Sequence, residues 1–217
     1  MNIVRIIKVA SYIPPLALDS EVLQKYRNSN MTLRLKYAGE NLLKEFNLVV
    51  STYRGRENDC ISELWYFLRD LGDPRVEASR TGLPGLIVAK TSLNPLEVVE
   101  KFSDIFKERP WEFRFILKVV PIEAVVKAIL EEISKTALSL AEEKIKENET
   151  YKIVVRKRLT DLRREEIIES IATKLNRKVN LTTPDKIVVV EIIGDYAGVS
   201  VLEEKHIFSP QKMRRSS

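Results

Sequence analysis

The sequence predicts an α+β protein made of two successive units, and three observations carry this prediction. The first half alternates short β-rich runs with two amphipathic helical segments in the order β-α-β-β-α. The second half holds a long helical pattern, then a basic strand and a shorter helix, and a hairpin pattern closes it. The chain has 217 residues, 44% of them hydrophobic, which is enough for one large domain or two small ones with packed cores.

The first unit is expected to be ferredoxin-like and to occupy residues 46–109. It follows an N-terminal extension, residues 1–45, in which only a strand at 3–9 and helical spacing around 33–46 can be read. The order β-α-β-β-α is that of a ferredoxin-like α+β unit, and a further strand at 113–119 can complete it.

Local signals place the elements of this unit. Its strands are expected in three short β-rich runs, 48–53, 76–79 and 85–90. Asn58 is expected to cap the first helix, which Gly72 and Pro74 end. The second helix has a stronger start signal, because a cap, a first-turn proline and an acid occur in succession at Asn94, Pro95 and Glu97.

The second unit, residues 110–205, is expected to be an α/β domain, followed by a basic C-terminal tail at 206–217. Its main helix is expected over 122–146, where apolar residues recur at the helical period. The remaining elements are expected in this order: a strand at 151–158, a helix at 162–175 capped by Thr160 or Asp161, a short strand at 179–181, and a hairpin of 186–193 with 198–202.

Positive charge is concentrated in one short segment. Residues 150–164 hold six basic side chains and one acid, a net +5 that equals the formal charge of the whole chain. A concentrated basic patch on a near-neutral body is typical of a polyanion-binding protein. The alternative is a charge-rich surface of the kind found in thermophilic proteins, although such a surface usually interleaves the two signs.

The geometry of a strand and a helix start brings some of these side chains together. Arg156 and Arg158 lie on one strand face, because successive side chains alternate between faces. Arg163 and Arg164 are expected in the first helical turn, where cations oppose the helix dipole. Either a bound anion relieves this conflict, or neighbouring acids at 165 and 166 balance the two arginines at the surface.

Two features of the first unit admit alternatives. Arg54 and Arg56 flank a glycine before a helix start, and they are candidates for a phosphate or partner contact, or for ion pairs with Glu57, Asp59 or Glu63. The alternating aromatic residues of the 113–119 region are expected to be core rather than base-stacking platforms, and they are Trp111, Phe113 and Phe115.

Several kinds of chemistry are not expected. One Cys and one His cannot build a zinc site, and the sequence has neither a dinucleotide fingerprint nor a phosphate loop. Cys60 lies beside the apolar face of a helix and is expected to be buried, and His206 has no nucleophile nearby. No signal peptide or long apolar run is present, so an intracellular, cytoplasmic protein without catalytic site, metal or cofactor is expected.

Several segments together resemble a THUMP domain, the RNA-binding module of tRNA thiolation, methylation and pseudouridylation enzymes. They are TYKIVVRKR (150–158), the helix at 163–172, VNLTTPDKIVVVEIIGD (179–195) and AGVSVL (197–202). Other segments resemble a narrower group, the stand-alone THUMP proteins that are tRNA-binding adaptors of the RNA cytidine acetyltransferase forming N4-acetylcytidine. These are STYRGREN (51–58), GLIVAK (85–90), PWEFRFILKVVP (110–121) and FSPQKMR (208–214).

The resemblance implies a non-catalytic protein that holds the acceptor stem and 3′ end of tRNA and presents it to a modification enzyme. The alternatives are a general structured-RNA or ribosome-associated protein, or a subunit of an enzyme for tRNA thiolation, methylation or pseudouridylation. RNA contacts are expected from a set of basic side chains: Arg156, Lys157, Arg158, Arg163, Arg164, Lys178, Lys118, Lys212, Arg214 and Arg215.

Overall fold

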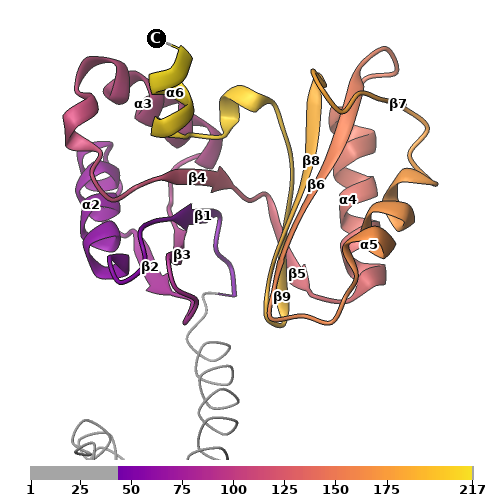
Figure 1. Cartoon of the computed structure of the whole chain (residues 1–217), viewed down its shortest axis with the longest axis horizontal. Helices are drawn as coiled ribbons and strands as arrows, with labels where there is room; N and C mark the ends of the chain where they lie inside the picture. The colour runs from indigo at the N-terminus through magenta and orange to yellow at the C-terminus, as the bar shows by residue number, and fades with distance from the viewer. Residues whose placement is uncertain (1–43, 217) are drawn as a thin grey trace, which may run out of the picture. The chain divides into compact units, whose positions relative to one another are not determined.

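The structure of the protein, a computed structural model that describes residues 44–216, contains two β-sheets that succeed one another along the chain (Figure 1). The expected strand at 3–9 and nearly all of the helical spacing around 33–46 lie outside the described residues. Helices accompany both sheets, so the predicted α+β fold is confirmed.

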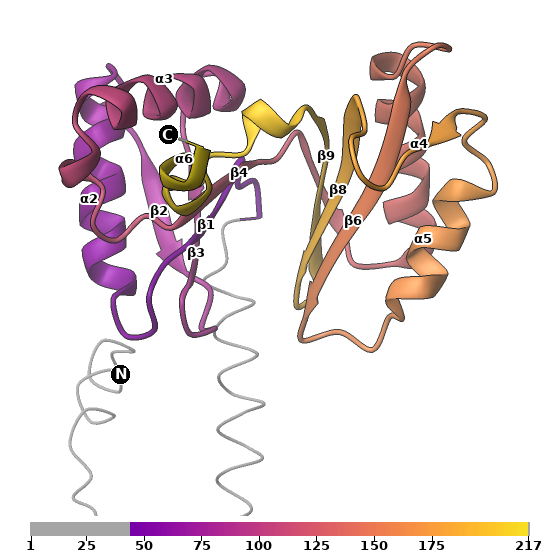
Figure 2. The ribbon, with the colours of Figure 1, turned by 45° about the horizontal axis from the view of Figure 1, so that its top comes forward.

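The first sheet has the predicted ferredoxin-like topology. Its strands pair antiparallel in the order β2-β3-β1-β4, and they are β1 (Leu48–Ser51), β2 (Glu77–Arg80), β3 (Leu86–Lys90) and β4 (Lys118–Pro121). Helix α2 (Glu57–Asp70) joins β1 to β2, and helix α3 (Pro95–Glu108) follows β3. Both helices lie on the same side of the sheet (Figure 2). The Asn94 side chain caps α3 as predicted, because it accepts a hydrogen bond from the Leu96 N–H.

Alternate residues of the first sheet belong to two different cores. Leu48 and Val50 of β1 pack against α2 and α3, whereas Val49 between them packs against residues of the second sheet. The helical side is rich in aromatic rings, and Phe67 of α2 stacks on Phe113 with ring centroids 4.2 Å apart. The first sheet is therefore buried on both faces.

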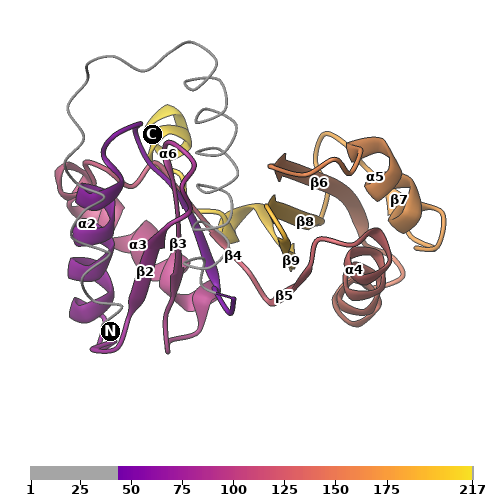
Figure 3. The same cartoon turned by 90° about the horizontal axis from the view of Figure 1, so that it is seen from below.

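The second sheet is mixed and has five strands in the order β5-β9-β8-β6-β7. These strands are β5 (Ala124–Lys127), β6 (Thr150–Arg158), β7 (Lys178–Val179), β8 (Lys186–Ile193) and β9 (Tyr196–Leu202). The predicted hairpin is confirmed as β8 and β9, and β6 pairs parallel with β8. Helices α4 (Leu130–Lys144) and α5 (Arg164–Ala172) lie on one side of this sheet (Figure 3).

The other face of the second sheet packs directly on the first sheet. Ile187 and Val189 of β8 share a core with Val49 of β1 and Val88 of β3. Gly198 of β9 lies at this contact, where an added Cβ would come within 3.0 Å of the side chains of Ile122 and Phe46. The absence of a side chain at Gly198 allows the two sheets to approach each other.

The C-terminal segment returns to the first sheet. After β9 come a short 3-10 helix, η3 (Glu204–His206), and helix α6 (Pro210–Ser216), which lies beside α3 (Figures 1 and 2). Phe208 exchanges two backbone hydrogen bonds with Val119 of β4 and is fully buried. Its ring packs among Phe102, Phe106 and Phe113, so a residue from the end of the chain completes the first core.

The strand expected at 113–119 is wrong for most of its length. The strand begins only at Lys118, and Trp111 lies in a 3-10 helix, η2 (Pro110–Glu112), with 66% of its surface exposed. The reason is Glu63 of α2, whose carboxylate accepts hydrogen bonds from the backbone N–H groups of residues 114, 115 and 116 at about 3 Å. These donors are not free to join a sheet. Phe113 is buried as predicted and Phe115 is half-buried against the same core, whereas the core position expected for Trp111 is wrong.

The helix expected over 122–146 is also wrong at its start. Residues 124–127 form β5, and the helix begins at Leu130. Val125 faces the core between the sheets and Val126 faces the helical core, an alternation that only a strand provides. The helical period and the alternating period coincide over so short a run, and pairing with β9 favours the strand.

The N-terminal caps predicted for α2 and α5 are both wrong. Helix α2 begins at Glu57, with Arg56 at the cap position, so Asn58 lies inside its first turn. Helix α5 begins at Arg164, with Arg163 at the cap position. The hydroxyl of Thr160 instead accepts a hydrogen bond from the Leu162 N–H within the preceding loop. In neither helix does a side chain of the cap residue bind the free N–H groups.

Replacing the buried ring that completes the first core should cost the whole protein stability. Phe208→Ala should lower the free energy of unfolding by about 3–5 kcal/mol, because it removes a buried ring and leaves a cavity. The measurement is urea denaturation followed by circular dichroism. Trp111→Ala removes an exposed ring and is the matched control, with a change below about 0.5 kcal/mol. Equal midpoints for the two variants would contradict the packing of Phe208.

Candidate nucleic-acid interface

The basic strand β6 presents its charges on two faces, as alternation predicts. Val154 packs in the core between the sheets and Val155 packs against the helices, so even-numbered residues face the first sheet. Arg156 and Arg158 therefore project on the same side, and Lys157 is exposed on the opposite side. The predicted grouping of the two arginines is confirmed.

A buried carboxylate that the sequence analysis missed holds these arginines. Glu191 lies in β8 opposite Arg156, and only 1% of its side chain is exposed. Its Oε1 accepts a hydrogen bond from Arg156 Nη1 at 2.7 Å, and its Oε2 accepts one from Arg158 Nη1 at 2.8 Å. The three charges sum to +1. The signal was present in the sequence, since Glu191 is the one acid inside the apolar run KIVVVEII.

Lys118 brings a cation of the first sheet to the same region. Burial, together with repulsion from Arg156, lowers the pKa of Lys118 to about 8. The negative charges of Glu191 and Glu204 act in the opposite direction and raise this pKa. The Lys212 ammonium also contributes to the field at Lys118 and pairs with Glu204. The predicted residues Lys118, Arg156 and Lys212 are therefore electrostatic neighbours, although they come from three separate parts of the chain.

Arg163 and Arg164 do not converge on one point. Arg163 is at the cap position of α5, and its guanidinium pairs with Glu166 through Nε at 2.7 Å and through Nη2. This pair supports the surface-balance alternative for Arg163. The side chain of Arg164 is exposed and makes no hydrogen bond or ion pair within residues 44–216. Arg164 and Lys157 are thus free for an anion, and so is Lys178, which is exposed on the edge strand β7.

The turn that leaves β6 is strained. Leu159, immediately after Arg158, has a φ of 58° and is the one non-glycine residue of the described chain with positive φ. A branched side chain in this region costs about 1–3 kcal/mol, and such residues persist where surrounding structure fixes them. Here the Gly194 N–H donates a hydrogen bond to the Arg158 carbonyl at 3.0 Å and fixes the end of β6.

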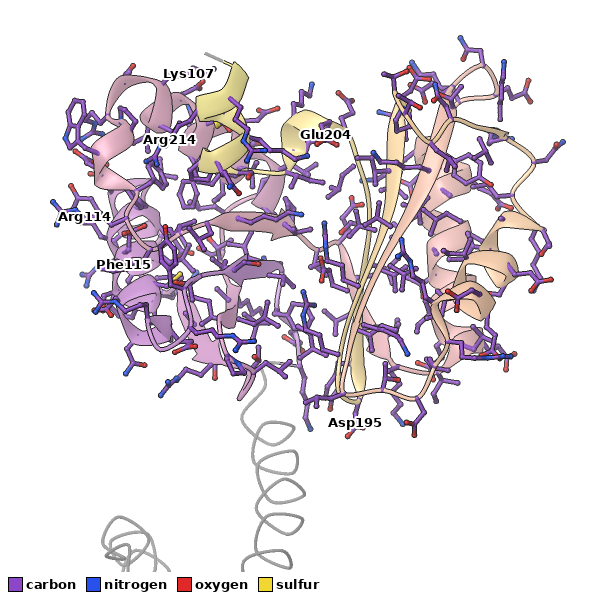
Figure 4. The ribbon with its side chains drawn as sticks, viewed as in Figure 1. Lys107, Arg114, Phe115, Asp195, Glu204 and Arg214 are labelled. Atoms are coloured by element: carbon purple, nitrogen blue, oxygen red, sulfur yellow. The ribbon has the colours of Figure 1, made fainter. Side chains whose placement is uncertain are left out.

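The basic C-terminal residues lie on the first unit and are partly engaged. The guanidinium of Arg214 in α6 lies over the ring of Phe106, 5.5 Å from its centroid, and Glu204 of η3 forms an ion pair with Lys212. Figure 4 labels Arg214 and Glu204 on these two helices. Arg215 is exposed. The segment expected to be a basic tail is therefore a packed helix, and only part of its charge is available to a ligand.

In the loop before α2, the two arginines differ. Arg56 pairs with Asp59 at 3.0 Å and lies over the ring of Phe115, which supports the ion-pair alternative. Arg54 is exposed and without a partner in the described residues. Between them and the sheet, the buried Glu57 carboxylate accepts hydrogen bonds from the N–H groups of Gly85 at 2.6 Å and Gly55 at 3.1 Å. This loop is thus built around Glu57.

Residues 44–216 contain no cluster of three or more metal-ligating side chains, and none of their helices is long and apolar enough to span a membrane. Cys60 is buried as predicted, and burial raises the pKa of its thiol to about 12. His206 accepts the Glu203 N–H through Nδ1 and so belongs to the local cap of η3.

Comparison with known proteins identifies the second unit. Residues 127–202 match the family model of the THUMP domain. THUMP domain-containing protein 1 of Mus musculus is 31% identical over 144 residues, which cover 62% of this chain and 41% of the mouse protein. The chain thus spans less than half the length of this relative. It contains a THUMP domain and is homologous to THUMP domain-containing protein 1.

Solved structures share the fold over both units. PH1313 from Pyrococcus horikoshii OT3 is 25% identical, with a TM-score of 0.53 over 72% of this chain and 54% of that one. TrmN from Thermus thermophilus is 16% identical, with a TM-score of 0.52 over 72% of this chain and 45% of that one. THUMP-domain proteins bind RNA and work with tRNA-modifying enzymes.

The Glu57 anchor should make stability depend on acid pH. The Gly85 N–H above all, helped by the Gly55 N–H and Arg80, lowers the pKa of Glu57 to about 2. Because this value is below the ordinary 4.5, Glu57 stabilises the fold above pH 4.5, and its contribution is lost as the pH falls toward 2.

Glu57→Gln should therefore cost about 1–3 kcal/mol at pH 7, and its deficit against the wild type should shrink between pH 5 and pH 3. Urea midpoints at pH 7, 5 and 3 measure this difference. Glu142→Gln on the exposed face of α4 is the control and should show no pH-dependent difference. A deficit that is constant with pH would show that the Glu57 carboxylate does not carry the effect.

Proposed function

We propose that this protein is a non-catalytic tRNA-binding subunit that presents tRNA to a modification enzyme, an RNA cytidine acetyltransferase forming N4-acetylcytidine. The THUMP domain and the homology to THUMP domain-containing protein 1 support the RNA-binding part. The segments 51–58, 85–90 and 110–121 resemble adaptors of that acetyltransferase and support the choice of partner. The proposed place of action is the cytoplasm.

The observation that carries the proposal is the arginine pair of β6. Two guanidinium groups lie side by side, each partly exposed, on a sheet face that also faces Lys118 of the first unit. Guanidinium forks match phosphate oxygens, and a lysine adds a point charge. Three further cations lie apart from this pair: Lys157 is on the opposite face of β6, Lys178 is beside Thr150 at the start of β6, and Arg164 begins α5.

Specificity for tRNA then comes from shape and from the unpaired 3′ end. The major groove of A-form RNA is too narrow for side chains, so phosphates, 2′-hydroxyls and unstacked bases are what a protein reads. We infer that the phosphates of the acceptor stem and its 3′ end lie along the β6 face. Cations contributed by β4 and by the C-terminal segment require the two units to bind the same RNA together.

Removing the arginine charges should weaken tRNA binding and reduce its salt dependence. Arg156→Gln/Arg158→Gln removes both positive charges, and urea denaturation checks that the variant is folded although the buried Glu191 has lost both arginines. The slope of log affinity against log salt should fall by about 0.7–0.9 for each phosphate that the variant no longer neutralises. Fluorescence anisotropy with labelled tRNA across a salt series measures this slope.

The matched control is Lys135→Gln/Lys174→Gln, which removes the same charge from exposed positions near the helices of the second unit. The same tRNA lacking its 3′ single-stranded end should bind the wild type much more weakly. Equal binding of intact and trimmed tRNA, or an equally weakened control variant, would leave a general RNA-binding surface instead.

The lowered pKa of Lys118 should make binding sensitive to alkaline pH. A phosphate near Lys118 favours the charged form of the lysine. Above the pKa of Lys118 in the free protein, the lysine must therefore take up a proton when RNA binds. Affinity should be constant below pH 7 and fall as the pH rises through 8, by up to about tenfold per pH unit. Lys118→Arg keeps its charge and should lose this dependence in titrations at pH 7 and 9. An unchanged pH profile in this variant would remove Lys118 from the site.

The partner is tested by reconstitution. Purified acetyltransferase, an acetyl donor and tRNA should give N4-acetylcytidine efficiently only when this protein is added, and the protein alone should give none. Modification of tRNA by the protein alone would overturn the non-catalytic assignment. Stimulation of a thiolation, methylation or pseudouridylation enzyme in place of the acetyltransferase would change the partner and retain the tRNA-binding role.

A further inference from the structure

We propose that Glu191 is a positioning residue of the RNA site, which holds the guanidinium groups of Arg156 and Arg158 side by side for neighbouring backbone phosphates. This inference rests on the proposed function. It adds to the RNA site a residue whose own negative charge would repel RNA. Its basis is the geometry of the three side chains across β6 and β8.

The placement of Glu191 is unfavourable for stability alone. It lies between Val190 and Ile192 in the middle of β8, with 1% of its side chain exposed. Removing a carboxylate from water is costly, and replacing a buried ion pair by apolar residues of similar volume is often neutral or stabilising. Every other residue of β8 between 187 and 193 is a buried hydrophobic residue, so an apolar side chain here would continue the pattern.

The way Glu191 is paired is what suggests a role in positioning. One arginine binding both oxygens would neutralise the carboxylate. Here two arginines share it, each donating from Nη1 to a different oxygen. The other N–H groups of both guanidiniums make no hydrogen bond to residues 44–216, and the side chains are 36% and 27% exposed. Both forks are therefore fixed in orientation yet still open to a ligand.

Fixing two long side chains in advance reduces the entropic cost of binding. An arginine that becomes ordered only in the complex costs about 0.5–1.5 kcal/mol. The strained Leu159 and the Gly194 hydrogen bond fix the backbone at the end of β6, so the Arg158 side chain starts from a defined position. Each guanidinium keeps four of its five N–H donors after its bond to Glu191. The anchored pair therefore presents these donors in a fixed arrangement, which suits the closely spaced phosphates of RNA.

Two explanations of Glu191 predict opposite changes in tRNA affinity when Glu191 is replaced by Gln. If Glu191 is only a negative charge near a polyanion site, then Glu191→Gln adds +1 and strengthens tRNA binding. If Glu191 positions the arginines, the amide accepts only one of the two hydrogen bonds, so one guanidinium is released and binding weakens. We expect a loss of tRNA affinity of about two- to tenfold at constant salt, which is the cost of ordering one arginine in the complex. We also expect an unchanged salt slope, because the same phosphates are bound.

A second variant changes the position of the carboxylate while keeping its negative charge. Glu191→Asp shortens the side chain by one methylene, so it cannot reach both guanidiniums as Glu191 does, and it should also weaken tRNA binding. The control is Glu166→Gln, which releases Arg163 from an exposed pair, also adds +1, and should leave affinity equal or slightly higher. Urea denaturation shows whether each variant is folded, and Glu191→Asp carries the test should Glu191→Gln not fold.

The outcomes separate this inference from the proposed function. Wild-type protein that fails to bind tRNA would overturn the proposed function itself. Wild-type binding with undiminished affinity in a folded Glu191→Gln or Glu191→Asp variant would overturn the positioning role alone. Weaker binding by both Glu191 variants, with the Glu166→Gln control unaffected, is the expected result.

Discussion

The direct packing of one sheet on the other is the contact on which the rest of this structure depends. Val49 and Val88 of the first sheet meet Ile187 and Val189 of the second, with Gly198 leaving room for the approach. Only because the sheets share a core does Lys118 of β4 lie in the field of Arg156 on β6. The candidate site is thus a product of the contact between units rather than of the THUMP domain by itself.

The net positive charge of a sequence segment does not show how many of its basic side chains remain available to a phosphate in the folded protein. Of the basic residues grouped by sequence, Arg163, Arg56 and Lys212 are paired with acids at the surface, and Arg214 lies over an aromatic ring. Surface pairs of this kind are weak and can exchange partners when a phosphate arrives. The arginine pair at Glu191 differs, because its carboxylate is buried and its partners stay in place.

The topology of this protein could be predicted from the sequence, whereas the bounds of several helices and strands could not. Strand alternation correctly grouped Arg156 with Arg158, since that property is local. It could not find Glu191 as their partner, because the register that joins them connects residues 35 positions apart. The helix expected from 122 failed because a short apolar run fits two periods, and the strand at 113–119 failed because a distant carboxylate takes its donors. The RNA-binding roles of the basic residues stay predictions.

The position of Phe208 has a consequence for how the protein is made. The first unit is synthesised before the THUMP domain, yet its core contains a ring that follows the THUMP domain in the sequence, and β4 receives the Phe208 backbone as an added neighbour. While the chain emerges from the ribosome, this unit therefore has an unfilled core and an uncovered strand edge until the THUMP domain has been translated. Folding of the two units is in this way completed together, once the residues after β9 have been translated, and a fragment that ends at β9 would leave the first unit unfinished.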